Sequence, residues 1–300
     1  MTGPARGPLT TAIVTSSYRG DVERCRLLCE SIDARVTGFT RHLILVEAAD
    51  LPLFQQFAGP RREIVSERDL LPVWLRPFPD PLSRGRRRVW LSPKGPPLRG
   101  WHVQQLRRLA MAAALPEAVM LSCDSDVVFV RDFDVADMQR AGAVEFHRIP
   151  DALATVIPAL VEGHRAWSRR AGVLLGIGAP AETETGYIAT VIAWRTDTVR
   201  DMMARIETVG GRPSLTSLAA SRALSECTIY GRFVDEAEER PERHFASERR
   251  LCRTYWDGEA MTGAELRRFT EAMSPEQVAV GIQSFTGTDT ALIRQAAGLA

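Results

Sequence analysis

Short apolar segments that alternate with helical segments constrain the fold of this chain most strongly. Residues 11–17, 43–46 and 118–123 are brief aliphatic runs, residues 62–66 form a weaker one, and helix-forming sequence lies between several of them. Such runs are typical of strands that are buried on both faces of a parallel sheet, with helices covering either side. The sequence therefore predicts an α/β fold with a mainly parallel sheet.

Helices are expected where apolar residues recur every three or four positions. Asp21 is a plausible N-cap for a helix that runs to about residue 34, and a second helix begins near residue 101. Further along the chain, a helix with Asp197 near its start should stop at Gly210-Gly211, and Thr262 and Glu265 match a capping box that opens a helix to about residue 273.

The rest of the chain is less regular. Residues 187–194 and 278–285 read as strands, whereas the proline- and arginine-rich residues 74–100 show no regular pattern. We found no internal repeat and no clean linker. The expected organisation is a flexible tail over residues 1–10, a ligand-binding half over residues 11–135 and a second half of the same domain over residues 136–300.

Composition excludes several classes of protein. With 45% hydrophobic and 25% charged residues, the chain is neither disordered nor collagen-like, and no apolar run is long enough to cross a membrane. A net charge of +1 argues against a nucleic-acid partner. Five cysteines without a C-x-x-C pair indicate reduced thiols. Since residues 1–10 hold no long apolar core, we expect no secretory signal and a cytoplasmic protein; peripheral contact with a membrane stays open.

The strongest chemical signal is the D-x-D formed by Asp124 and Asp126, directly after the strand predicted at residues 118–123. The carboxyl ends of strands are where open α/β sheets bind ligands, and two carboxylates there suit Mn²⁺ or Mg²⁺ that also binds substrate phosphates. The alternative is a pair of loop aspartates that cap turns. Apolar residues on both sides favour the metal site, because unpaired charge so near a core is costly.

Two classes of enzyme use such a pair. Haloacid-dehalogenase phosphatases are disfavoured, since their pair opens the first strand and needs a downstream lysine, whereas Lys94 is the sole lysine here. In GT-A glycosyltransferases the pair binds a cation that bridges the diphosphate of a nucleotide sugar and stabilises the leaving nucleoside diphosphate.

A series of further motifs supports the second class. They are TSSYRGD (15–21), GWHVQQLRRLA (100–110), CDSDVVF (123–129), SECTIYGRFVD (225–235), TYWDG (254–258) and VAVGIQSFTG (278–287). In this order the chain resembles, over about residues 11–295, a largely uncharacterised bacterial family of glycosyltransferases with a GT-A-like, Rossmann-type fold. The resemblance implies a nucleoside-diphosphate sugar as donor and a hydroxyl acceptor, such as a glycan or cell-surface polysaccharide, bound by the second half.

A basic stretch precedes the acidic pair. Residues 81–116 contain no Asp or Glu but hold eight cations: Arg84, Arg86, Arg87, Arg88, Lys94, Arg99, Arg107 and Arg108. It is either a solvated loop or a surface that contacts the donor diphosphate or an anionic acceptor. Arg99 and one of residues 86–88 are favoured as contacts, while Arg107 and Arg108 are expected on the outer face of their helix.

The resemblance also suggests residues for the nucleotide and for catalysis. Contacts to the donor fall on the loop after the first strand, on the W-H-x-Q-Q segment and on the acidic pair: Thr15, Tyr18, Arg19, His102, Gln105 and Asp124. A polar turn at residues 15–19 and a satisfied core histidine at position 102 are the alternatives.

Inverting GT-A enzymes use a carboxylate to deprotonate the acceptor hydroxyl, and Glu226, or second Asp257, is the candidate base here. A helix-start charge is the alternative for Glu226. No histidine lies in the C-terminal strand, where many GT-A enzymes place a metal ligand, so Gln283 and Ser284 stand there instead and strict dependence on metal is open. The sequence thus predicts a glycosyltransferase, with a non-catalytic nucleotide-sugar-binding protein of a polysaccharide-assembly complex as the alternative.

Overall fold

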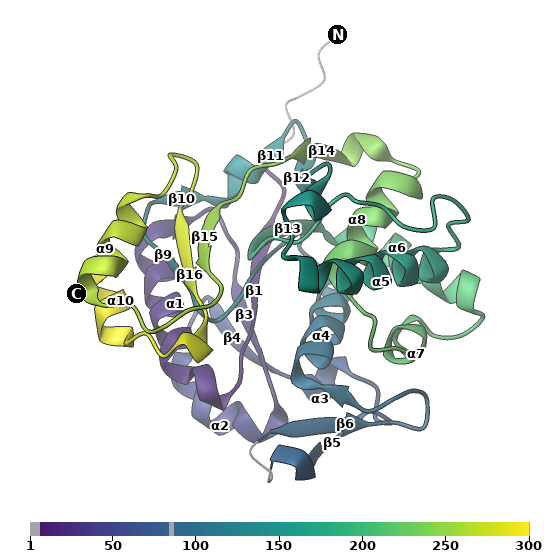
Figure 1. The fold of residues 1–300 in the computed structure, drawn as a ribbon, viewed down its shortest axis with the longest axis horizontal. Coiled ribbons are helices and arrows are strands. Elements are labelled where there is room, and N and C mark those ends of the chain that lie inside the picture. The colour runs from purple at the N-terminus through teal and green to yellow at the C-terminus, as the bar shows by residue number, and fades with distance from the viewer. Residues whose placement is uncertain (1–6, 84–86, 300) are drawn as a thin grey trace.

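A five-stranded sheet forms the centre of the molecule in the computed structural model, which describes residues 7–83 and 87–299 (Figure 1). Its strand order is β13-β8-β1-β3-β4. The first four strands in sequence pair in parallel, and β13 is antiparallel to β8 at one edge. The strands are β1 (Thr11–Ser16), β3 (His42–Val46), β4 (Arg62–Ser66), β8 (Val119–Cys123) and β13 (Val191–Arg195).

Helices cover both faces of this sheet, with α1 on one side and α4, α5, α6 and α8 on the other (Figure 1). Side chains of β1, β3 and β8 are almost fully buried, as expected for strands covered on both faces. The helices are α1 (Val22–Arg35), α2 (Leu51–Phe54), α3 (Glu67–Leu70), α4 (Gly100–Ala114), α5 (Pro158–Leu175), α6 (Thr196–Gly210), α7 (Ser214–Ala219), α8 (Glu226–Glu236), α9 (Gly263–Glu271) and α10 (Thr290–Ala296). The predicted α/β class with a mainly parallel sheet is confirmed.

Smaller sheets surround the central one. Strand β9 of the first half pairs with β16 of the second. Within the second half, β12 pairs with β14 and β15 pairs with β16. The remaining strands are β2 (Val36–Thr37), β5 (Arg76–Pro79), β6 (Arg88–Leu91), β7 (Leu98–Arg99), β9 (Val127–Phe129), β10 (Phe133–Asp134), β11 (Gln139–Arg140), β12 (Ala143–His147), β14 (His244–Ser247), β15 (Cys252–Tyr255) and β16 (Ala279–Ile282).

Two helix boundaries lie where capping residues in the sequence predicted them. The capping box of Thr262 and Glu265 is present at the start of α9, and Gly211 ends α6 with a positive φ of 60°. All five cysteines are buried and free of disulfides, and no helix within the described residues is long and apolar enough to span a membrane.

Three predictions of secondary structure were wrong in part. Residues 74–100 are not irregular throughout: β5, β6 and β7 form an antiparallel sheet, and β5 accommodates Pro77 and Pro79 because it is an edge strand. The strand expected at 187–194 begins only at residue 191, since Tyr187 packs on Phe146 and donates a hydrogen bond to Asp235. The strand expected at 278–285 ends at residue 282.

Candidate functional site

A cleft of about 1140 Å³ opens at the carboxyl ends of the central strands. After β1 the chain adds β3 and β4 on one side and then β8 on the other, so the strand order reverses between β1 and β8. Ligands of open α/β sheets bind at such a switch point, because the loops that leave the two strands diverge there. Residues that follow β1 and residues that follow β8 both line the cleft.

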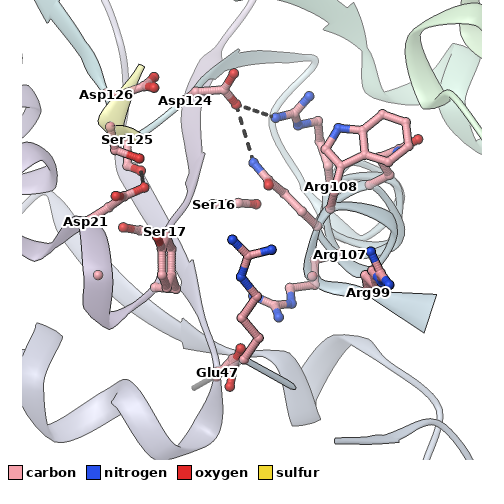
Figure 2. A pocket seen from close by; sticks show the side chains of 18 of the residues that line it. Ser16, Ser17, Asp21, Glu47, Arg99, Arg107, Arg108, Asp124, Ser125 and Asp126 are labelled. Atoms are coloured by element: carbon pink, nitrogen blue, oxygen red, sulfur yellow. Dashed lines mark hydrogen bonds and ion pairs between the residues drawn. The ribbon is translucent and has the colours of Figure 1, made fainter. Parts of the chain in front are cut away.

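Three carboxylates form one wall of the cleft, as Figure 2 shows. Asp124 and Asp126 follow β8, and Asp21 precedes α1. Asp21 is the N-cap residue of α1, but its side chain makes no capping bond; it accepts a hydrogen bond of 3.3 Å from Ser125 instead. The predicted N-cap is therefore correct in position, and its carboxylate belongs to the cleft.

This wall concentrates negative charge in a buried place. Burial, together with the charges of Asp124 and Asp21, raises the pKa of Asp126 to about 7. One oxygen of Asp126 and one of Asp21 are buried without a hydrogen-bond partner among the described residues. Unsatisfied buried oxygens are costly, so the wall is complementary to a cationic group.

Hard oxygen donors of this kind fit Mg²⁺ or Mn²⁺. Within residues 7–83 and 87–299, no cluster of three or more His, Cys, Asp or Glu side chains could hold a metal ion by itself. The wall fits a cation that takes one or two protein carboxylates and completes its coordination with phosphate oxygens and water.

Arginines from the basic stretch form the facing wall (Figure 2). The expectation that Arg107 and Arg108 lie on the outer face of their helix was wrong: their exposed fractions are 4% and 8%, and both line the cleft. Helix α4 is packed between the sheet and neighbouring helices, and each guanidinium has a carboxylate partner that allows its burial. Arg107 pairs with Glu67 at 3.0 Å.

Arg108 connects the acidic wall of the cleft to the candidate base Glu226. One of its guanidinium nitrogens donates to Asp124 at 2.8 Å and another to Glu226 at 2.6 Å. Burial alone would lower the pKa of Arg108, but the two carboxylates raise it above its usual range. Arg108 is therefore a permanent cation between the acidic pair and the candidate base.

Glu226 is buried at the start of α8, where Ser225 is the N-cap. Its backbone nitrogen donates to the side-chain oxygen of Gln105 at 3.0 Å. Burial raises the pKa of Glu226, although Arg108 and backbone N–H groups favour its charged form. The predicted base and the predicted donor residue Gln105 thus lie together in the cleft lining.

The favoured basic contacts are only partly described. Arg99 is exposed and lines the cleft, as do Arg87 and Arg88, and Arg88 pairs with Glu47 at 2.8 Å. Arg84 and Arg86 lie outside the described residues.

Of the three donor contacts expected on the loop after the first strand, Thr15, Tyr18 and Arg19, two line the cleft. Tyr18 is half exposed, and Arg19 is held by Asp50, which accepts hydrogen bonds from its backbone and side chain at 2.9 and 2.8 Å. Thr15 is fully buried, and its hydroxyl contacts His42 at 3.1 Å and Cys123 at 3.3 Å. The side chain of Thr15 therefore points into the sheet instead of the cleft.

Two other candidates lie outside the cleft lining. His102 is half-buried, with its ring nitrogen 3.1 Å from the carbonyl of Arg222. Asp257 is exposed on the loop after β15, although its neighbour Trp256 lines the cleft.

Sequence reasoning did not name several residues of the cleft: Asp21, Glu47, Asp50 and Trp256, and also Trp101 and Gln104, although their W-H-x-Q-Q segment was expected at the donor. Asp21 and Glu47 could have been found, because they follow strand ends at the same edge of the sheet as the D-x-D. The TYWDG motif indicated a site residue near Trp256, but the residue chosen from it was Asp257, since the packing of β15 decides which of the two side chains reaches the cleft.

Comparisons with known proteins identify a family. The model described as "Family of unknown function (DUF6492)" matches residues 8–295. A search of curated proteins found no sequence match. Among solved structures, the chain is similar to an active-site mutant of LgtC, with 14% sequence identity and a TM-score of 0.48, over 96% of this chain and 95% of that chain.

Proposed function

This chain belongs to the family of unknown function DUF6492, and we propose that it is a glycosyltransferase that moves a sugar from a nucleoside-diphosphate sugar to a hydroxyl acceptor. The observation that carries the proposal is the pairing of an acidic wall with an arginine wall in one cleft of about 1140 Å³ at the strand switch point. A donor of this class needs cationic groups for its diphosphate and a carboxylate near its sugar, and it is large enough to require such a volume.

The donor diphosphate would lie between the two walls. Arg99 is exposed at the cleft, and Arg87 is exposed at its rim, so both are available to fork onto phosphate oxygens. Tyr18 and Arg19, on the loop after β1, would contact the nucleoside. Tyr18, Arg19, Arg87 and Arg99 thus keep the donor-binding role expected from the sequence. Gln105 supports Glu226 instead, and Thr15 has no role in the site.

Asp124 and Asp126 would hold a divalent cation against the diphosphate. Bound there, Mn²⁺ or Mg²⁺ would supply charge stabilisation to the leaving nucleoside diphosphate. Arg108 holds one oxygen of Asp124 and keeps that carboxylate turned toward the cleft.

Glu226 would act as the general base. Its carboxylate takes the proton of the acceptor hydroxyl, the acceptor oxygen forms a bond to the anomeric carbon, and the bond from that carbon to the diphosphate oxygen breaks. The electron pair of the broken bond leaves with the nucleoside diphosphate. Burial and the raised pKa of Glu226 make it a stronger base than an exposed carboxylate.

The test is turnover in Glu226→Gln. Glutamine keeps an oxygen that can accept from Arg108 but cannot take a proton, so nucleoside-diphosphate release from a panel of nucleotide sugars should fall by about a hundredfold or more. Glu239→Gln, an exposed change outside the cleft, is the matched control.

Turnover within a few-fold of the parent would contradict the role of Glu226. Tight donor binding with no release of nucleoside diphosphate by the unmodified protein would contradict the transferase proposal and favour a non-catalytic nucleotide-sugar-binding protein.

A further inference from the structure

One face of α4 lines the cleft with an ordered series of side chains. Gln104 and Gln105 each lie three or four residues from both Trp101 and Arg108, and all four side chains line the cleft. Arg108 contacts both Asp124 and Glu226, and Gln105 contacts the backbone of Glu226. Trp101 lies one helical turn from Gln105 and two turns from Arg108, toward the start of α4, and lines the same cleft as the candidate base and the acidic pair.

Trp101 is exposed but held in place. Its side chain is 49% exposed, which is unusual for the largest apolar residue. Trp167 of α5 supports it, with ring centroids 5.5 Å apart and an interplanar angle of 38°, and His164 packs on Trp167 at 4.7 Å. The indole is therefore positioned by packing while much of its surface stays free.

Polar side chains line the cleft together with Trp101. Arg99 is exposed beside it in sequence, and the side-chain nitrogen of Gln105 is buried without a hydrogen-bond partner among the described residues. The side-chain oxygen of Gln105 already accepts from Glu226, which fixes the free group as a donor.

From this arrangement we infer that Trp101 is the platform of an acceptor subsite and that the acceptor is a carbohydrate. The inference rests on the proposed function. A pyranose ring has an apolar C–H face that stacks on an indole and a rim of hydroxyls that need hydrogen-bond partners, which the glutamines and Arg99 provide. A lipid chain would instead need apolar walls, and Arg99, Gln104 and Gln105 are polar.

The test is calorimetric titration of the full chain with oligosaccharides, chosen on a glycan array that spans hexoses, N-acetylhexosamines and uronic acids. We expect at least one to bind, and Trp101→Ala to weaken its affinity by about tenfold or more through loss of the stacked ring. Trp101→Tyr keeps an aromatic ring and should retain most of the affinity. Phe78→Ala, on β5, removes an aromatic side chain of similar exposure (45%) outside the cleft lining and is the matched control.

Three results would overturn the inference: no oligosaccharide bound, unchanged affinity in Trp101→Ala, or binding to phosphatidylglycerol vesicles in place of oligosaccharides that depends on Trp101. Uridine and guanosine diphosphate are titrated into the same variants. If Trp101→Ala loses the oligosaccharide but keeps the nucleotide, the subsite is supported; if the parent binds the oligosaccharide but no nucleotide, the proposed donor chemistry fails while the platform stands.

Discussion

At the scale of single residues, Arg108 determines how the cleft is held together. It is 8% exposed and bonds to two carboxylates from different parts of the chain, Asp124 after β8 and Glu226 on α8. A buried guanidinium with two partners is well satisfied, but removal of the cation leaves both carboxylates uncompensated. The same residue therefore stabilises the fold and orients the two acids of the proposed reaction.

Arg108→Met should lower the free energy of unfolding by roughly 3–5 kcal/mol, because it leaves the buried carboxylate of Glu226, and the partly exposed one of Asp124, without their cation. Urea denaturation at neutral pH measures the loss. Arg165→Met is the matched control: Arg165 pairs with Glu182 and Glu184 at the surface, so its loss should cost less than about 1 kcal/mol. Equal urea-denaturation midpoints for the two variants would mean that the ion pairs of Arg108 do not stabilise the fold more than a surface pair does.

Residue types alone did not reveal this bridge. Arg107 and Arg108 occupy a helix with a clear apolar face, and a charged pair on such a helix is usually solvated. Both are buried because acidic partners from distant segments meet them, Glu67 in one case and Asp124 with Glu226 in the other. Long-range pairing of this kind has no local signature, whereas Asp124 and Asp126 could be predicted from their place after a strand.

At the scale of elements, His42 links three strands of the central sheet. It lies in β3 with no exposed surface, its Nε2 is 3.1 Å from the hydroxyl of Thr15 in β1, and its Nδ1 accepts from Arg62 of β4 at 3.0 Å. Burial and the charge of Arg62 lower the pKa of His42 to about 3. The neutral ring is therefore part of the folded sheet.

This linkage predicts an acid dependence of stability. In the unfolded chain His42 takes up a proton below its ordinary pKa of about 6.5, whereas in the folded chain it does so only near pH 3. The contribution of His42 to the free energy of unfolding is therefore fully present above pH 6.5 and is lost as the pH falls toward 3. His42 contributes at most about 1.4 kcal/mol per pH unit in that window. His42→Gln should reduce the loss of unfolding free energy between pH 7 and pH 5, measured by urea denaturation. The same loss in parent and variant would contradict the assignment.

Elements were predictable where one local pattern fixed them. The strands of the central sheet, α1, α4 and the capped start of α9 follow from apolar periodicity and caps. The sheet of β5, β6 and β7 could not be predicted, because its strands pair only with one another and its prolines mask the pattern of alternation.

At the scale of the whole molecule, the near-neutral balance of 38 basic and 37 acidic residues conceals a separation of charge. The acid-free segment contributes Arg87, Arg88, Arg99, Arg107 and Arg108 to one cleft, which Asp21, Asp124 and Asp126 face from the strand ends. The sequence shows that the basic segment and the acidic pair are close neighbours along the chain. Their arrangement as opposed walls depends on α4 folding back along the sheet.

If the polarised cleft binds a nucleoside diphosphate through a cation on the acidic pair, calorimetry of the full chain will show metal-dependent binding. Uridine, guanosine, adenosine and cytidine diphosphates are titrated with Mn²⁺ and again with a chelator, into the parent, Asp126→Asn and Asp132→Asn. Asp132 is 91% exposed at its side chain and is the control. We expect at least one nucleotide to bind the parent and Asp132→Asn with Mn²⁺, and the chelator or Asp126→Asn to weaken binding by about tenfold or more. Equal affinity in all three proteins, or none in any, would contradict this expectation.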